Sequence, residues 1–380
     1  MKTATAETAA AVPMHALIVN SVLTGGGVDS HTLSLCLALL RAGVRVSLAV
    51  SERARLLPRA RAIAGLELLV LGRRRQTWPF GLAAYIRRES VQVIHAHHGR
   101  DYWVALLGSK LSLKSTQVVV TRHLMTPVKP RTLRLLAPPV RVIAVSDAVT
   151  RALHDCDPTH SLALRRIHCG IDTEVFSPDS DAGRQAARVA QGFAPDDVVF
   201  AVIGPVHGVD GKGQFYFAAA AAQVMASCPR ARFLCVGEGD AVDRLQAEAT
   251  RLGLASRFEV RPFTDEVRSV MRAIDVLVHP AVSSEALGLV ILEALACGRP
   301  VIASHLDGIS ETFVAGVHGL LVPPRDADAL AAAMSTLAVD GKLRQALGSA
   351  GRDWVQRKFS LECLGPATRS LYADSLSAVG

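Results

Sequence analysis

The chain has 380 residues, half of them hydrophobic, and a formal net charge of +8 at pH 7. This length and composition allow two or three globular domains with separate cores. They argue against a membrane-spanning helix, because no uninterrupted apolar run reaches about 18 residues, and against a signal peptide, because residues 1–13 are small and polar.

Apolar, β-rich segments alternate with helix-length segments along the whole chain. The first series of predicted strands comprises 15–23, 44–50, 66–71, 91–96, 116–121 and 140–146. The second comprises 198–204, 232–237, 257–262, 275–280 and 300–304. This alternation is typical of βαβ units and parallel sheets. We therefore predict an α/β protein with two Rossmann-like, doubly wound parallel-sheet domains.

The segment 168–183 is rich in turn-forming and acidic residues, as is typical of a linker between domains. We predict a flexible tail over 1–13, a first domain over 14–180 and a second domain over 181–357. The seven cysteines are dispersed without a C-x-x-C pair, which favours reduced thiols over zinc ligands or disulfides. A cytoplasmic location is therefore expected.

The loops after the strands carry the functional information, because ligands of open parallel sheets bind beyond the carboxyl ends of the strands. Gly25, Gly26 and Gly27 follow the first predicted strand, and their backbone N–H groups suit a phosphate or a sugar. With Glu52 at the end of the second strand, the loop also resembles a dinucleotide site, although Ser30 occupies the third glycine position. A tight structural turn is the remaining alternative.

Lys212 stands between Gly211 and Gly213, in the loop after the first strand of the second series. A cation beside the free amides of a helix start suits a diphosphate. A solvated lysine at a helix start would show the same pattern.

Histidines cluster at the ends of two strands in the first half. His95, His97 and His98 follow the fourth strand, but their loop lacks the i, i+4 spacing of many zinc sites, so no metal is expected. His123 ends the fifth strand in a region without acids. It is a candidate to hydrogen-bond a sugar or assist proton transfer, the alternative being a loop histidine bonded to backbone.

Two carboxylates belong to an otherwise apolar stretch, Glu285 and Glu293. From Leu287 to Cys297 every residue except Glu293 is apolar or glycine, which predicts a helix buried on most sides. An unpaired buried carboxylate would destabilise the fold by several kcal/mol, so hydrogen-bond donors must come from the protein or from a bound molecule.

The positive charge is concentrated in residues 102–146, which contain no Asp or Glu. Such a surface attracts a membrane leaflet, a phosphorylated substrate or nucleic acid, unless it is only a solvated face. Nucleic acid is the least expected, because Tyr102 and Trp103 lie at one end and no aromatic residues alternate with the cations. The cations are Lys110, Lys114, Arg122, Lys129, Arg131, Arg134 and Arg141.

Together these motifs resemble the retaining glycosyltransferases of family four, which have the GT-B fold of two Rossmann-like domains facing a cleft. The resemblance covers nearly the whole chain, and the pair Glu285 and Glu293 matches the family's most characteristic signature. The matching segments are GGGVDSHTLSLCLALLRAGVRV, VIHAHH, VVVTRH, VIAVSDAV and HCGIDTEVFSP, then GKGQF, FLCVGEGD, DVLVHPAVSSEALGLVILEALACGRPVIAS, SETFVAGVHGLLVPPRD and KFS.

The resemblance implies a role for each candidate residue. Glu293 would hydrogen-bond the ribose of a nucleoside-diphosphate sugar, Glu285 would lie near the transferred sugar, and Lys212 would hold the diphosphate. The nucleobase would lie at 261–263. The residues expected to bind the donor are Gly26, Gly27, His207, Lys212, Arg261, Phe263, Gly288, Leu289, Val290 and Glu293, and those expected to act in catalysis are Glu285, His123 and Lys212.

One departure from the family pattern concerns the diphosphate. The family usually has Gly-Arg after the first strand of the second domain, with the lysine five residues beyond the arginine. Here Pro205 follows Gly204, and His207 lies five residues before Lys212. Either His207 or another cation compensates, or donor binding is weakened, or the chain is a binding-only relative.

The resemblance implies a metal-independent, retaining hexosyl- or related glycosyltransferase with no cofactor beyond a nucleotide-sugar donor such as a UDP-sugar. We expect a glycan or lipid-linked acceptor in lipopolysaccharide or other cell-surface polysaccharide synthesis, at the inner face of the cell membrane. Residues 358–380 would cross back to the first domain, as in GT-B proteins generally. The alternatives are a non-catalytic sugar-nucleotide-binding partner, a nucleotide-sugar epimerase and a nicotinamide-dependent oxidoreductase.

Overall fold

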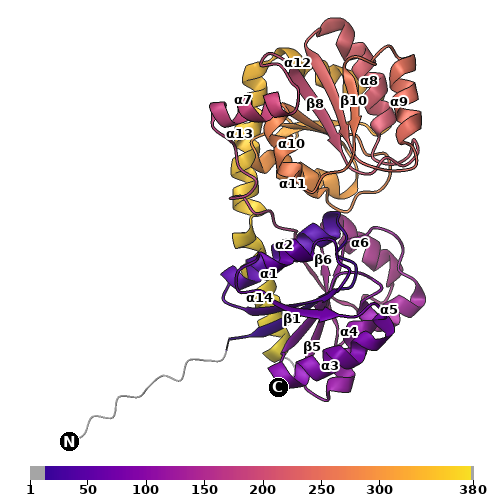
Figure 1. Ribbon diagram of the computed structural model, residues 1–380. Helices are drawn as coiled ribbons and strands as arrows, with labels where there is room; N and C mark the ends of the chain where they lie inside the picture. Colours follow the sequence, from indigo (N-terminus) through magenta and orange to yellow (C-terminus); the bar gives the residue numbers. More distant parts are fainter. Residues whose placement is uncertain (1–12, 378–380) are drawn as a thin grey trace, which may run out of the picture. The chain divides into compact units, whose positions relative to one another are not determined.

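Thirteen strands form two parallel sheets in the computed structural model, which describes residues 13–377 (Figure 1). The strands are β1 (His15–Asn20), β2 (Arg45–Ser51), β3 (Glu67–Leu71), β4 (Val93–Ala96), β5 (Gln117–Arg122), β6 (Arg141–Ala144), β7 (Ala163–Arg166), β8 (Val198–Ile203), β9 (Ala231–Val236), β10 (Phe258–Arg261), β11 (Val276–His279), β12 (Val301–Ser304) and β13 (Gly319–Val322).

The strand order in both sheets is doubly wound. The first sheet has the order β3-β2-β1-β4-β5-β6-β7 and the second the order β10-β9-β8-β11-β12-β13. In each, the order reverses beside the strand that begins the series, β1 or β8, as in Rossmann-like folds. The predicted α/β class is confirmed. Only the edge strands β7 and β13 were missed: β7 ends in two arginines, and β13 is a short run that begins with glycine.

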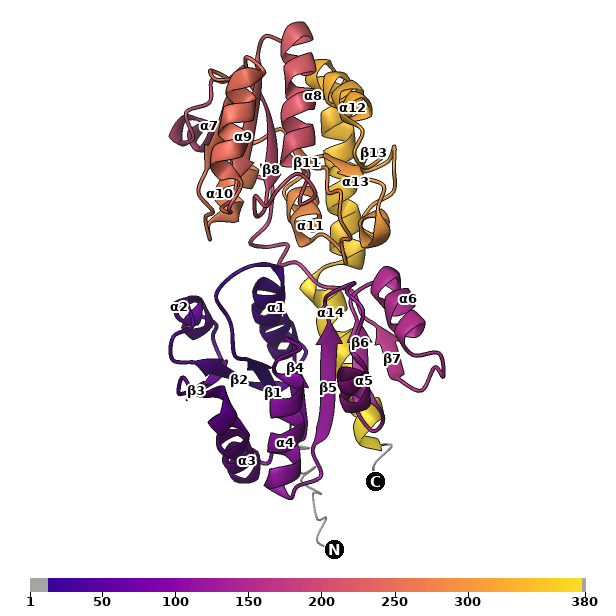
Figure 2. The same cartoon turned by 90° about the vertical axis from the view of Figure 1, so that its right-hand side faces the viewer.

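Helices connect the strands and cover the faces of both sheets, as Figure 2 shows. No helix within residues 13–377 is both long and apolar enough to cross a membrane. The helices are α1 (Gly27–Arg41), α2 (Leu57–Arg61), α3 (Trp78–Glu89), α4 (Tyr102–Ser112), α5 (Pro130–Leu136), α6 (Asp147–Cys156), α7 (Asp181–Ala190), α8 (Gln214–Ser227), α9 (Val242–Arg251), α10 (Val267–Ala273), α11 (Leu289–Ala296), α12 (Ala327–Val339), α13 (Gly341–Lys358) and α14 (Leu361–Ser377), with the short 3₁₀ helices η1 (Arg75–Thr77) and η2 (Asp307–Glu311).

The chain packs as two compact units. The first contains the residues up to Thr121, Arg134–Val142 and the residues from Gly365 onward, and the second contains Arg122–Leu133 and Ile143–Leu364. The domain boundaries expected from the sequence stay a prediction. The expected tail lies outside the described residues except for Pro13, as do residues 378–380 of the last predicted segment.

The central strands explain why each sheet forms. All six residues of β1 and all six of β8 are buried, because helices cover both faces of a parallel sheet and each strand is therefore apolar on both sides. In the second unit, the ring of Phe233 stacks on Phe200 at a centroid distance of 6.1 Å and meets Phe217 of α8 edge-on at 5.9 Å. These contacts hold α8 against the sheet and so position the loop that precedes it.

The final helix packs within the first unit from Gly365 onward. A Cβ atom at Gly365 would lie 2.3 Å from the Ala38 carbonyl oxygen of α1, so only glycine permits this approach. Arg369 donates a hydrogen bond to the Ala42 carbonyl at 3.0 Å. One turn later, the buried Tyr372 hydroxyl lies 2.6 Å from His95 Nδ1.

Candidate active site

The loop between β8 and α8 is shaped by close backbone contacts. Gly213 precedes α8 with φ of 78°, and a Cβ atom there would lie 1.8 Å from the Pro280 carbonyl oxygen. The stem of Lys212 crosses Gly204, where an added Cβ atom would meet the lysine Cγ at 3.4 Å. These glycines therefore bring Lys212 beside the loop that follows β11.

Lys212 forms an ion pair with Glu285 in that loop. Its Nζ atom donates to Glu285 Oε2, and His279 Nε2 lies 3.3 Å from the same oxygen. The side chains of Lys212, Glu285 and His279 are 29%, 15% and 2% exposed, respectively. The deeply placed carboxylate of the stretch is thus Glu285, and the protein itself supplies its partners.

The electrostatics of this cluster favour an ionised carboxylate. Burial alone would raise the pKa of Glu285, but hydrogen bonds and charges from His279 and Lys212 outweigh it and hold the pKa at about 2. Burial lowers the pKa of His279 more than Glu285 raises it, so this imidazole is neutral near pH 7. Its Nδ1 atom is buried and has no hydrogen-bond partner among the described residues. His279 therefore contacts Glu285 through Nε2, and its other ring nitrogen takes no part in the cluster.

Backbone hydrogen bonds fix the loop that carries Glu285. The Glu285 carbonyl accepts from Gly308 N at 3.1 Å, and Val282 N donates to the Gly211 carbonyl at 3.2 Å. A Cβ atom at Gly308 would lie 1.9 Å from the Ala286 carbonyl oxygen. The loop is therefore held between η2 and the Lys212 loop, and the Glu285 carboxylate has little freedom to leave the cluster.

The first turn of α11 presents unbonded amides beside this cluster. Gly288 caps the helix in a left-handed conformation, with φ of 84°, and the N–H groups of Leu289 and Val290 have no acceptor inside the helix. Leu289, Val290 and Glu293 are partly exposed, whereas the other residues of α11 are buried. Because positions three and four apart share one helix face, these three residues form a single accessible face. The prediction of a helix buried on most sides is confirmed, because five of the eight residues of α11 are buried, and Glu293 lies on the one accessible face.

Two other residues of the predicted donor site lie in different settings. His207 Nδ1 contacts Asp240 Oδ1 at 2.8 Å on the surface, with the imidazole 62% exposed. The Arg261 guanidinium donates to the Gln191 carbonyl at 2.9 Å and lies over the Phe193 ring at 5.4 Å. Arg261 therefore holds its own neighbourhood together, and its guanidinium is engaged within the protein rather than presented to a donor.

The glycine loop of the first unit is built around an internal carboxylate. Asp29 in the first turn of α1 is 1% exposed, and it accepts from Gly25 N and from Asn20 Nδ2, both at 2.8 Å. His98 Nε2 lies 2.9 Å from the same carboxylate. Burial would raise the pKa of Asp29, but these partners lower it overall. Gly26 has φ of 98°, and Gly27 begins the helix.

The remaining histidines differ in burial. His95 is fully buried between Tyr372 and Thr121, and burial lowers its pKa to about 3, so its role is structural. The His97 ring packs on His95 at a centroid distance of 4.4 Å. His123 follows β5 and is partly exposed, which leaves it accessible at the carboxyl end of its strand.

Sequence reasoning missed Asp29 and His279. A signal was present for both, because Asp29 lies in the first turn of the helix after β1, and His279 is the last residue of β11. The rule that ligands bind at the carboxyl ends of strands applies to both positions.

Two doubly wound sheets, with a cation and a carboxylate beside an open helix N-terminus, define a class of proteins that bind nucleotides or nucleotide sugars. Solved glycosyltransferases have the same GT-B fold. The glycosyltransferase from Rickettsia africae aligns with a TM-score of 0.83 and 18% identity, over 96% of this chain and 99% of that chain. HepE from Anabaena in complex with UDP and glucose aligns with a TM-score of 0.80 and 20% identity, over 95% and 100%.

Sequence comparisons identify the family. The model described as Glycosyltransferase Family 4 matches residues 25–175, and that described as Glycosyl transferases group 1 matches residues 197–340. A D-inositol 3-phosphate glycosyltransferase of Kribbella flavida is 30% identical over 322 residues, which is 76% of this chain and 74% of the relative. The chain therefore belongs to the family-four glycosyltransferases of the GT-B fold.

A second relative is a GDP-mannose-dependent monoacylated alpha-(1-6)-phosphatidylinositol monomannoside mannosyltransferase of Corynebacterium glutamicum. It is 31% identical over 281 residues, which is 72% of this chain and 68% of that protein. The names of both relatives refer to a phosphorylated inositol, D-inositol 3-phosphate in the first and phosphatidylinositol in the second.

Proposed function

We propose that this protein is a retaining glycosyltransferase that moves a sugar from a nucleoside diphosphate to a hydroxyl group of an anionic acceptor. The observation that carries the proposal is the placement of Lys212 beside the first turn of α11, where it is paired with Glu285, whose carboxylate His279 also contacts. A fixed cation and unbonded amides together stabilise the charge that develops on a departing diphosphate.

The residues of the cluster have separate tasks in this mechanism. Lys212 leaves Glu285 to contact the diphosphate, and Glu285 then accepts a hydrogen bond from the sugar. The bond between the anomeric carbon and the phosphate oxygen breaks, and the acceptor oxygen attacks the same face of the sugar. The acceptor proton passes to the leaving phosphate, and His123 orients the sugar or the acceptor. Glu293 binds the ribose from the accessible face of α11.

The acceptor is proposed from charge and from the relatives. Residues 102–146 contain seven cations and no acid, which favours a negatively charged acceptor. The relatives' acceptors, an inositol phosphate and a phosphatidylinositol mannoside, indicate a phosphorylated polyol or a lipid carrying one. A lipid-linked precursor of lipopolysaccharide or another surface polysaccharide belongs to the same chemical class, and such an acceptor would bring the enzyme to the inner face of the membrane.

The first test measures nucleoside diphosphate released from UDP-, GDP- and ADP-sugars in the presence of EDTA. Inositol phosphate and a bacterial lipid extract serve as acceptors. Release by the wild type, with large losses in Lys212→Ala and Glu293→Ala, would support a metal-independent transferase. Lys342→Ala is the matched control, because Lys342 is an exposed lysine of the same unit. The anomeric configuration of the product, read by NMR, tests retention.

Other outcomes would identify the rival functions. A donor that binds but is never consumed, with any acceptor, would favour a non-catalytic partner. This alternative is motivated by the sequence, because the arginine that the family carries five residues before its lysine is absent ahead of Lys212. A donor sugar that isomerises without any acceptor would favour an epimerase.

A further inference from the structure

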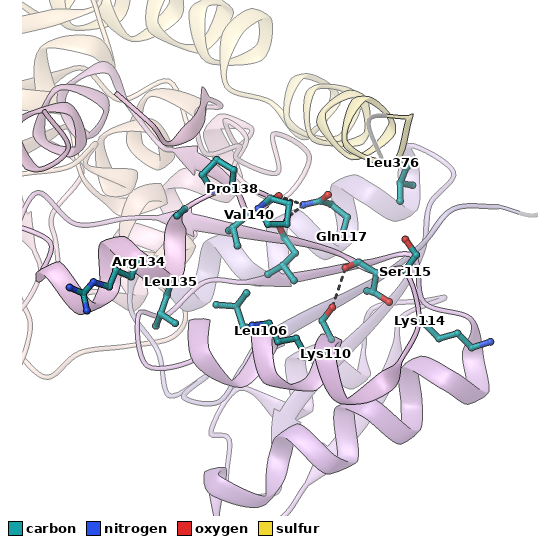
Figure 3. Close-up of a pocket in the computed structure, with 15 residues that line it drawn as sticks. Leu106, Lys110, Lys114, Ser115, Gln117, Arg134, Leu135, Pro138, Val140 and Leu376 are labelled. Carbon is teal, nitrogen blue, oxygen red and sulfur yellow. Dashed lines mark hydrogen bonds between the residues drawn. The ribbon is translucent and has the colours of Figure 1, made fainter. Parts of the chain in front are cut away.

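A cavity of about 630 Å³ lies in the first unit, away from the glycine loop (Figure 3). Its wall includes Ser115–Val118, where β5 begins, and Val140, which precedes β6. The cavity therefore lies at the amino ends of these parallel strands, whereas the glycine loop lies at the carboxyl end of β1. Since substrates of such sheets bind at the carboxyl ends, this cavity is not explained by the transfer reaction. Its volume lies within the range of small-molecule sites, roughly 300–1,000 Å³.

The wall of the cavity offers few polar groups to a ligand. Ser109 Oγ donates to the Thr116 carbonyl at 3.1 Å, and Gln117 Nε2 donates to the Pro139 carbonyl at 2.8 Å, so these donors are already used. The apolar side chains of the wall come from α4, from the segment 135–140 and from α14, and they include Leu106, Leu135, Pro138, Val140 and Leu376. A ligand that fills the cavity must therefore be apolar along most of its length.

The rim, by contrast, is positively charged. Lys110, Lys114 and Arg134 line the cavity and are exposed, and none of them forms an ion pair with a carboxylate of the described residues. Arg134 and Lys114 lie at opposite ends of the row of labelled apolar side chains in Figure 3. The absence of Asp and Glu from 102–146 leaves the positive potential of this rim uncompensated by its own segment, so it complements an anion.

From this combination we propose that the cavity binds a monomeric anionic amphiphile, a single hydrocarbon chain with a carboxylate or phosphate head. The chain lies against the apolar wall, and the head lies at Lys110 and Lys114, near the end of α4. Burial of the chain supplies the affinity, at about fourfold for each methylene, and the lysines select the charge of the head.

The test is isothermal titration of the full chain with monomeric octyl phosphate, dodecyl phosphate and dodecanoate, with dodecyl maltoside as the neutral probe. We expect dodecyl phosphate to bind at least tenfold more tightly than octyl phosphate, and dodecyl maltoside to bind at least tenfold more weakly than dodecyl phosphate. Equal affinity for the neutral and anionic probes would overturn the proposal, because the lysines would then contribute nothing.

Variants separate this site from general attraction to a basic protein. Lys110→Glu/Lys114→Glu should weaken dodecyl phosphate binding at least tenfold, whereas the matched control Arg59→Glu/Arg61→Glu, on exposed positions of α2, should leave it unchanged. Ala137→Trp fills the cavity and should abolish binding, with circular dichroism as the check on folding. Equal losses in the two charge variants would contradict a specific site.

A last arm distinguishes a free ligand from a membrane surface. Sedimentation with phosphatidylglycerol vesicles is compared with the titrations. Binding to vesicles without binding of any monomeric amphiphile would overturn the proposal in favour of surface adsorption. None of these measurements requires a sugar donor, so their outcome is independent of the proposed transfer reaction.

Discussion

The loop after β1 and the loop after β8 occupy equivalent places in their sheets but are held in different ways. In the first, the Asp29 carboxylate bonds to Gly25 N and Asn20 of its own loop and strand. In the second, Lys212 bonds to Glu285, a carboxylate that follows a different strand. The charge of the first loop is used to shape the loop itself, whereas the second holds an ion pair between two loops, which under the proposed function exchanges partners when the substrate binds.

The glycines of the two loops differ in the same sense. Gly26 has φ of 98°, but a Cβ atom there would meet nothing within 4 Å. Gly213 combines φ of 78° with a Cβ position only 1.8 Å from a backbone oxygen. At Gly26 the first loop needs glycine for its conformation alone, whereas at Gly213 the second loop needs it also for space. The following predictions test this contrast, beginning with the largest expected effect.

Glu285→Gln should lower kcat about 100- to 1,000-fold, a loss similar to that on removing one preorganised hydrogen-bond donor from an oxyanion hole. The amide keeps the size of the side chain but removes the charge that holds Lys212. Steady-state release of nucleoside diphosphate measures the effect, with Glu266→Gln, on an exposed position of the same unit, as the control. A kcat within tenfold of wild type would contradict the assigned role.

Gly213→Ala should lower the free energy of unfolding by about 3 kcal/mol, because the methyl group adds overlap with Pro280 to an unfavourable φ. Gly26→Ala should lower it by only about 1 kcal/mol, the cost of the conformation alone. Thermal and urea unfolding of both variants measure the difference. Equal losses would show that the second loop relaxes without strain.

The acid sensitivity of the second loop should follow the depressed pKa of Glu285, which is about 2 against an ordinary value of 4.5. A carboxyl group with a lowered folded-state pKa stabilises the protein above its unfolded-state pKa, and this stabilisation is lost as the pH falls toward the folded-state value. Wild type should therefore lose about 3 kcal/mol of folding stability relative to Glu285→Gln between about pH 5 and pH 2. Parallel stability curves for the two proteins would refute this assignment.

Asp29→Asn should destabilise the first loop by about 1–2 kcal/mol. Gly25 N and Asn20 Nδ2 each donate to one oxygen of the Asp29 carboxylate. A side-chain amide has only one oxygen to accept from them, and its NH₂ group would face the other donor. The matched control is Asp243→Asn, an exposed aspartate in the first turn of α9, which should change stability by less than about 0.5 kcal/mol. Melting temperatures compare the two. If Asp243→Asn were as destabilising as Asp29→Asn, the hydrogen bonds inside the first loop would not account for the stability lost in Asp29→Asn.

Local sequence patterns were sufficient to predict both sheets and to select the loops in which chemistry is expected. Apolar runs of strand length marked eleven of the thirteen strands, because a strand buried on both faces is apolar in most of its positions. The rule for the carboxyl ends of parallel strands then selected the Gly25 and Lys212 loops. The resemblance to family four, carried by Glu285 and Glu293, supplied the chemistry expected of them.

The partners of these residues depended on tertiary structure. Lys212 and Glu285 are 73 positions apart, and no local pattern reveals that they meet or that His279 lies beneath them. Glu293 lies on the accessible face of α11 because of how that helix packs on its neighbours. The cavity at the amino ends of β5 and β6 joins residues 106–140 to Leu376. Local patterns report which residues avoid water, but the contacts between distant segments are decided only when the elements pack together.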